Sequence, residues 1–97
     1  MLLRTSPLNQ HLTALGIKEI EHGYIDSNLT NLTINFANSH TTPPTMIICE
    51  PDNLTSRYVT HGNATNTSFD AITYGYRTTE VIYRATTPFY WVAIWFN

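Results

Sequence analysis

The chain has 97 residues and a formal net charge of −2, and only 12% of its residues are charged. A length of this order is typical of one domain with a single small core. The five basic residues are scattered and form no stripe that could follow a phosphate backbone, so we expect no nucleic-acid partner. The longest apolar run, residues 89–96, is too short to span a bilayer, so we expect no membrane insertion.

Residues 1–16 are predicted to form a helical connector or the end of a stalk. Ser6 can cap a helix, and Pro7 fits its first position, where a missing N–H costs nothing. Gly16 fits the left-handed position that ends a helix. An apolar stripe at helical spacing consists of Leu8, Leu12 and Leu15. A helix this short is marginal alone, so it either caps the following domain or docks against copies of itself.

Residues 17–97 are predicted to form a β-sandwich. Short apolar or alternating segments recur at intervals of about 8–12 residues and are separated by turn-forming residues. The main predicted strands are 31–36, 45–50, 56–61, 69–76, 80–85 and 89–96, with a weaker first strand at 20–25. The predicted fold class is therefore all-β, a small antiparallel β-sandwich of six to seven strands with a short N-terminal helix.

The final strand is apolar on both faces. Phe89, Trp91 and Trp95 lie on one face, and the alternate residues from Tyr90 to Phe96 lie on the other. Only one face can fill the core, and the other must be covered to avoid aggregation. We expect Phe89, Trp91 and Trp95 to form a subunit interface in a homo-oligomer, first a trimer and second a dimer. The alternative is that the N-terminal helix covers this face.

Nothing in the sequence predicts an enzyme, a cofactor or a metal site. Cys49 is the only cysteine, and at a strand position it is interpreted as a small buried hydrophobe. No nucleophile motif or Gly-rich phosphate loop is present. The four histidines lack metal-ligand spacing: His11, His22, His40 and His61.

A mixture of aromatic and polar residues between positions 52 and 84 favours a shallow carbohydrate site. Tyrosine rings can stack on a sugar while fixed polar groups bind its hydroxyls. The predicted ligand-binding residues, on loops at one end of the sandwich, are Asp52, Arg57, Tyr74, Tyr76 and Arg77. Two alternatives remain open: the tyrosines are core or interface residues, and Arg77 pairs with Glu80 across a turn.

Five N-x-Ser/Thr sequons are present, at Asn28, Asn31, Asn53, Asn63 and Asn66. One interpretation is a glycosylated eukaryotic surface protein. The favoured interpretation is Thr-rich strand and turn chemistry in a protein that never meets the glycosylation machinery.

Residues 23–95 resemble the C-terminal tip domains of bacteriophage tail and head fibres, which are similar in pattern to H-type lectin sandwiches. The matching segments are a strand ending in Phe at 32–36, a proline pair entering a strand at 42–47, a Thr-rich turn at 63–69 and a W-x-A strand at 91–94. The resemblance implies a trimer on the virion that attaches to host cell-surface glycans or another receptor and joins other virion proteins through its N-terminus. The alternatives are a structural or decoration module of a virion and a secreted eukaryotic lectin.

Overall fold

The computed structural model describes residues 14–52, 55–78 and 81–97. The helix predicted within residues 1–16 falls mostly outside these residues. Gly16 has φ 84°, the left-handed conformation expected of a glycine that ends a helix. Its carbonyl accepts a 2.8 Å hydrogen bond from the Asn97 N–H, so the two ends of the described chain meet. No helix within the described residues is long and apolar enough to cross a membrane.

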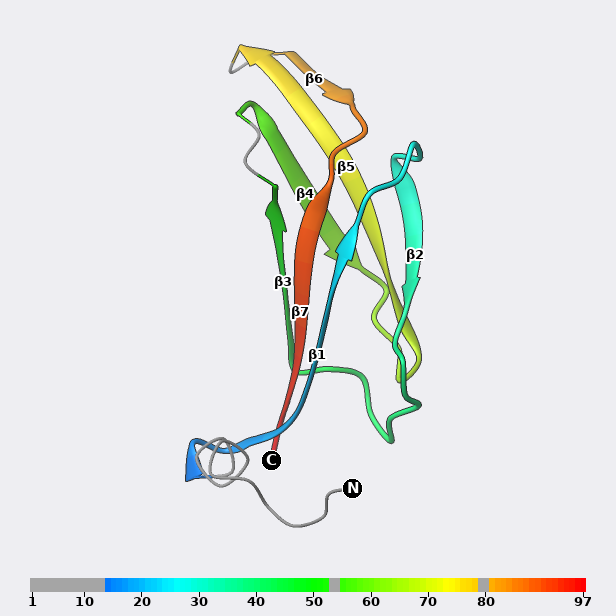
Figure 1. The fold of residues 1–97 in the computed structure, drawn as a ribbon, viewed down its shortest axis with the longest axis vertical. Coiled ribbons are helices and arrows are strands. Elements are labelled where there is room, and N and C mark those ends of the chain that lie inside the picture. The colour runs from blue at the N-terminus through cyan, green and yellow to red at the C-terminus, as the bar shows by residue number, and fades with distance from the viewer. Residues whose placement is uncertain (1–13, 53–54, 79–80) are drawn as a thin grey trace.

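The described residues form seven strands in two antiparallel sheets, which confirms the all-β prediction (Figure 1). The first sheet has the order β1-β7-β3, with β1 at Ile17–Ile25, β7 at Phe89–Phe96 and β3 at Met46–Pro51. The second has the order β2-β5-β4, with β2 at Asn31–Asn35, β5 at Ser68–Thr78 and β4 at Arg57–Gly62. A short strand, β6 at Val81–Arg84, pairs with β5.

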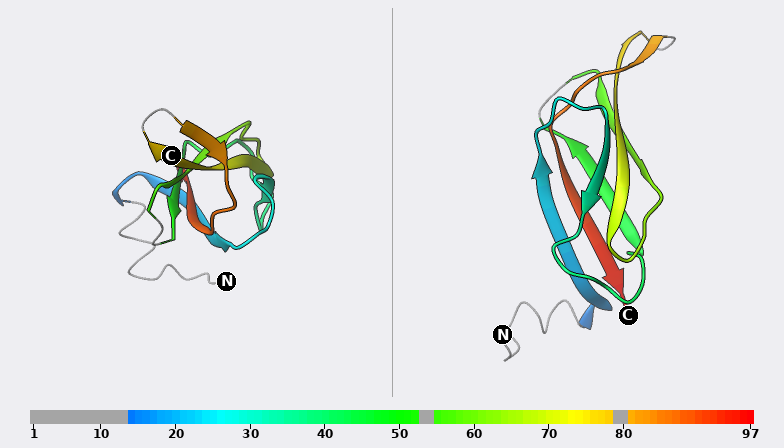
Figure 2. Two further views of the ribbon diagram at one scale, coloured as in Figure 1. Left: turned by 90° about the horizontal axis from the view of Figure 1, so that it is seen from above. Right: turned by 90° about the vertical axis from the view of Figure 1, so that its right-hand side faces the viewer.

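The longest strand, β5, organises the second sheet. Its first half pairs with β2, its second half pairs with β6, and β4 lies along the opposite edge. The β5–β6 hairpin therefore extends past the end of the first sheet, as two views of the molecule show (Figures 1 and 2). This extension leaves both sides of the hairpin without cover from the first sheet.

The core lies between the two sheets and is mainly aromatic. The second sheet and the residue that follows β2 contribute Ile34, Phe36, Phe69 and Ala71, and the first sheet contributes Phe89, Trp91, Ala93 and Trp95. Across the sheets, the rings of Phe69 and Trp91 are 5.3 Å apart at 65°, an edge-to-face arrangement that aromatic pairs prefer. The alternation of residues 32–36 thus buries the face that the sequence pattern predicted.

The predicted subunit interface of Phe89, Trp91 and Trp95 is wrong. These side chains are 0%, 6% and 2% exposed within one chain, so they fill its own core. The error concerns which of two apolar faces of β7 points inward. The wide indole rings fit the inner face because Gly23 lies opposite Trp91 in the register, and a Cβ there would lie only 2.6 Å from the indole nitrogen.

Candidate functional site

A row of aromatic and basic side chains crosses the outer face of the second sheet. Arg84 on β6, Tyr74 on β5 and Tyr58 on β4 are direct neighbours in the strand register. The Tyr58 and Tyr74 rings stack with centroids 5.0 Å apart and planes at 17°. The Arg84 guanidinium lies 5.8 Å from the Tyr74 ring centroid, within the range of a cation–π contact. We call this row, together with Tyr76, the tyrosine face.

Tyr76 extends the tyrosine face toward the end of the hairpin. It follows Tyr74 by two residues on β5, so both side chains leave the same side of the sheet. Its ring centroid is 6.3 Å from that of Tyr58, and 41% of the residue is exposed. The three rings therefore form a partly exposed aromatic plate.

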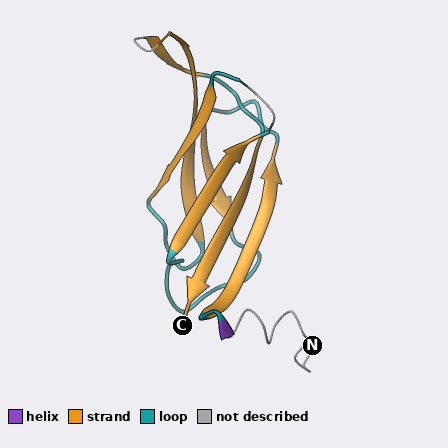
Figure 3. Cartoon of the chain, turned by 90° about the vertical axis from the view of Figure 1, so that its left-hand side faces the viewer, coloured by secondary structure: helices purple, strands orange, loops and turns teal. Residues whose placement is uncertain are grey.

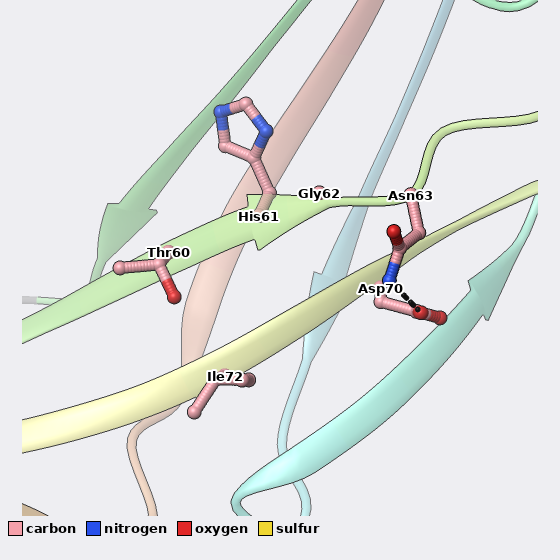
Figure 4. A pocket seen from close by; sticks show the side chains of 6 residues that line it. All are labelled: Thr60, His61, Gly62, Asn63, Asp70 and Ile72. Carbon is pink, nitrogen blue, oxygen red and sulfur yellow. Dashed lines mark hydrogen bonds between the residues drawn. The ribbon is translucent and has the colours of Figure 1, made fainter.

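An open hollow of about 150 Å³, with a mostly apolar lining and a few polar groups, lies on the same face, further along β4 and β5 (Figure 4). Its lining includes the paired residues Thr60 and Ile72. Thr60 is two residues from Tyr58 on β4, and Ile72 is two residues from Tyr74 on β5. At its far end Asp70 Oδ2 accepts a 3.0 Å hydrogen bond from the Asn63 side-chain amide, and Oδ1 accepts a 2.9 Å bond from the Thr33 hydroxyl. These bonds hold the carboxylate in a fixed orientation.

The hollow and the aromatic plate are close enough to serve one ligand. Asp70 and Tyr74 are four residues apart on one extended strand, a separation of about 13 Å. Asn63 has φ 53°, a left-handed conformation that Asn tolerates, and this turn brings its amide over Asp70. The arrangement provides fixed acceptors and donors beside stackable rings, which is the chemistry that recognises a carbohydrate longer than one ring.

The five predicted ligand-binding residues do not form one cluster. Tyr74 and Tyr76 belong to the tyrosine face, as described above. The Arg77 guanidinium instead lies 5.5 Å from the ring centroid of Tyr83, which covers Gly75 on the other side of the hairpin. Arg57 lies with them, because its Nη1 would be 3.1 Å from a Cβ on Gly75.

Asp52 is engaged at the first sheet rather than near the tyrosines. Its Oδ2 accepts a 2.8 Å hydrogen bond from the Tyr24 hydroxyl, and its N–H donates to the carbonyl of Pro88. The hydrogen bond to Asp52 is the largest cause that raises the pKa of Tyr24 to about 12. The structure therefore places Asp52 apart from the other four predicted residues, which lie on β4 and β5 rather than in one loop cluster.

Sequence reasoning missed four members of this site: Tyr58, Arg84, Asp70 and Asn63. Their pairings join positions between 7 and 16 residues apart, and they depend on the register of β4, β5 and β6. The available signal was strand parity, since Asp70, Tyr74 and Tyr76 are all even-numbered positions of one predicted strand. Parity could place them on one face but could not show that this face points outward.

A second cluster surrounds the buried His40. Its Nε2 lies 2.5 Å from Glu21 Oε2, its Nδ1 lies 3.0 Å from Glu19 Oε2, and its ring stacks on Trp95 at 3.7 Å. Burial would lower the pKa of His40, but the two carboxylates outweigh burial and raise it above its ordinary value of 6.5. This cluster fastens the segment between β2 and β3 to β1 through the hydrogen bond of His40 Nε2 to Glu21, while Nδ1 forms an ion pair with Glu19 but no hydrogen bond of good geometry.

Glu21 completes that attachment by accepting backbone hydrogen bonds from Ala37 at 2.6 Å and from Asn38 at 3.2 Å. Burial would raise the pKa of Glu21, but the hydrogen bonds from His40 and from these two amides lower it below 4.5. The cluster is structural in character, because every group in it that forms these bonds points at another part of the same chain.

Metal and thiol chemistry receive no support from the part of the chain that the structure describes. No group of three or more His, Cys, Asp or Glu side chains that could hold a metal ion occurs within residues 14–52, 55–78 and 81–97. Cys49 is half-buried against the core, and burial raises its pKa to about 11, so the thiol stays protonated near neutral pH.

Comparison with protein-family models, with curated proteins and with solved structures gave no match to this chain.

Proposed function

We propose that this chain is a non-enzymatic carbohydrate-binding module whose ligand lies across the tyrosine face and the adjoining hollow. The observation that carries the proposal is the stacked row of Tyr58, Tyr74 and Arg84 beside the fixed Asp70–Asn63 pair. Stacked rings that are already ordered lose little conformational entropy on binding. A carboxylate and an amide that are already oriented give directional hydrogen bonds to sugar hydroxyls.

We further propose that the module is the tip domain of a bacteriophage tail or head fibre, located on the virion, where it attaches to host cell-surface glycans. The support is the sequence resemblance over residues 23–95 together with a site of the chemistry that such attachment needs. Single shallow sites bind weakly, and several copies on one fibre raise avidity without any new contact.

Adjacent residues on the β5–β6 hairpin provide a matched test of the site. Tyr76→Ala and Tyr74→Ala should each weaken binding to a panel of bacterial surface polysaccharides and to intact cells by roughly tenfold. Tyr76→Ala removes an exposed ring, and Tyr74→Ala removes the ring that packs between Tyr58 and Arg84 and keeps the row in order. Arg77→Ala is the control, since its side chain packs with Tyr83 on the other side of the hairpin. Equal loss in all three variants would reject the assignment of the site to the tyrosine face.

A structural module of a virion is the second candidate function, favoured by the apolar outer face of the first sheet described below. The parent protein distinguishes the two candidates. If the parent binds neither polysaccharides nor cells when the concentration of binding sites is in the millimolar range, the attachment proposal fails and the structural module remains. Binding that Asp70→Asn also weakens, with the melting temperature unchanged, would support carbohydrate recognition at the hollow.

A further inference from the structure

The outer face of the first sheet is mainly apolar across all three strands, with His22 of β1 beside Val92 as a polar member of its middle row. We call it the apolar face, and its members are Ile20, Tyr24, Met46, Ile48, Tyr90, Val92, Ile94 and Phe96. The register aligns them in rows, such as Ile20, Ile94 and Met46 across β1, β7 and β3. Figure 3 shows this sheet toward the viewer, with no described element lying across it.

The exposed area of the apolar face is large for a chain of this size. Six of its side chains, three of them aromatic, are 38–52% exposed. A fully accessible aromatic side chain presents about 150–250 Å², so the six together leave roughly 500 Å² in contact with water. That value lies in the upper part of the range of about 300–600 Å² for the largest apolar patch on an ordinary monomer, and the largest patch is often functional.

The distribution of charge on the apolar face resembles that of a protein–protein interface. The central strand β7 carries no charged residue, and the ionisable groups of this face, Lys18, His22 and Glu50, lie on the two edge strands. An uncharged centre with a polar rim is the usual anatomy of an interface. Because the centre is uncharged, two copies can bring their apolar faces together without opposing like charges.

The aromatic groups of this face are also ordered in the single chain. The Tyr24 and Tyr90 rings are 4.7 Å apart at 52°, and the hydrogen bond to Asp52 fixes the Tyr24 hydroxyl. Ordered side chains lose less conformational entropy when a partner covers them. This favours a rigid folded partner that meets the face as it stands.

We propose that the apolar face is the surface through which copies of this chain associate. Two such faces packed together would bury roughly 1,000 Å² in total, which is the minimum for a specific interface. The tyrosine face lies on the opposite side of the sandwich, so association would leave one tyrosine face of each copy accessible. The proposal does not depend on what the tyrosine face binds.

The test is the mass of the full chain in solution. Analytical ultracentrifugation at 1–100 µM (roughly the range for a small interface) should give a mass that is a multiple of 11.1 kDa. The double variant Ile48→Thr/Tyr90→Thr should raise the dissociation constant at least about tenfold, since both side chains lie in the proposed contact. Threonine suits an exposed strand position, so the variant should keep its fold and its circular dichroism spectrum.

The matched control is Ile82→Thr, which removes an equally exposed aliphatic side chain from the second sheet. Ile82 is 58% exposed, and Ile48 is 49% exposed. The control should associate as the parent does. A parent mass of one chain throughout the concentration range would overturn the proposal, as would a double variant that associates as tightly as the control.

The competing occupant is the N-terminal segment of the same chain, residues 1–13, which enters the described structure next to β1. A single-chain mass for the parent together with association after deletion of residues 1–13 would show that this segment covers the face. That result would overturn the proposal, whereas association of both forms would support it. Failure of this test leaves the polysaccharide-binding test untouched, because that test measures ligand binding by tyrosine variants.

Discussion

The two outer faces of the sandwich differ in chemistry although alternating strands build both. The apolar face has aliphatic and aromatic side chains across three strands and an uncharged centre. The tyrosine face combines stacked rings with Arg84 and, further along, with the hydrogen-bonded Asp70. The first face offers apolar area but few directional hydrogen bonds, which suits contact with another protein surface. The second offers fixed donors and acceptors beside flat rings, which suits a polar ligand of defined shape.

One small core can therefore support two outer surfaces of different chemistry. The inner residues of β5 and β7 fix the packing of the sheets, so the outer residues are free to take either chemistry. Substitutions at inner and outer positions test whether the side chains of each strand divide between the core and the outer surface as the structure indicates.

Substitution of two adjacent residues of β7 should give the largest difference in the free energy of unfolding. Trp95→Ala should destabilise the fold by about 3–5 kcal/mol, because it opens a cavity in a core where the side chain is 2% exposed. Phe96→Ala, on the apolar face, should cost much less at a concentration where the chain is a monomer. Urea denaturation of both variants measures the difference. Similar losses in the two variants would contradict the assigned faces of β7.

A pair of glycines should give the next largest contrast. Gly23→Ala should cost about 1–3 kcal/mol, because its Cβ would lie 2.6 Å from the Trp91 indole nitrogen and must displace the ring. Gly62→Ala, beside the hollow, should change stability by less than about 1 kcal/mol, because its Cβ meets nothing within 4 Å. Thermal unfolding measures both. If Gly23→Ala is as stable as Gly62→Ala, the position of Trp91 under β1 is wrong.

The His40 cluster predicts a defined dependence of stability on pH. The raised pKa of His40 stabilises the fold below pH 6.5, and this contribution is lost as pH rises through the folded-state pKa. The lowered pKa of Glu21 stabilises the fold above pH 4.5, and this contribution is lost as pH falls through the folded-state pKa. Stability from this cluster should therefore be greatest between pH 4.5 and 6.5.

His40→Gln provides the comparison for the pH measurement. It should lower the free energy of unfolding by about 1–3 kcal/mol near pH 6, because the carboxylates lose a charged partner. The difference from the parent should shrink toward high pH, where the histidine of the parent loses its charge. A difference that stays constant from pH 5 to pH 9 would mean that charge on His40 does not stabilise the fold.

Thr73→Val should give the smallest effect, a stabilisation of about 1 kcal/mol. Thr73 is 0% exposed on the inner face of β5, and its hydroxyl has no hydrogen-bond partner. Valine has nearly the same shape and removes the unsatisfied polar group without leaving a cavity. A higher melting temperature confirms the prediction. A loss of stability would show that the hydroxyl has a partner, such as a buried water.

The strands and most of their limits can be predicted from the amino-acid sequence alone. Turns that contain Pro, Gly or Asn bound most of the apolar segments, and the seven strands lie close to their predicted ranges; β7 begins and ends at the predicted residues. The alternation of residues 32–36 also identified its buried face, because only one parity there is apolar. Local chemistry is sufficient where a strand has one apolar face.

Only the tertiary structure decided which face of β7 is buried and which residues form the candidate site. Both parities of β7 are apolar, so the choice depends on the close approach of Gly23 to Trp91. The tyrosine face depends on the pairing of β4, β5 and β6, which places Tyr58 and Arg84 on either side of Tyr74. The physical reason is that a strand specifies its own alternation, whereas its partner and the direction of the core depend on contacts between residues far apart in the chain.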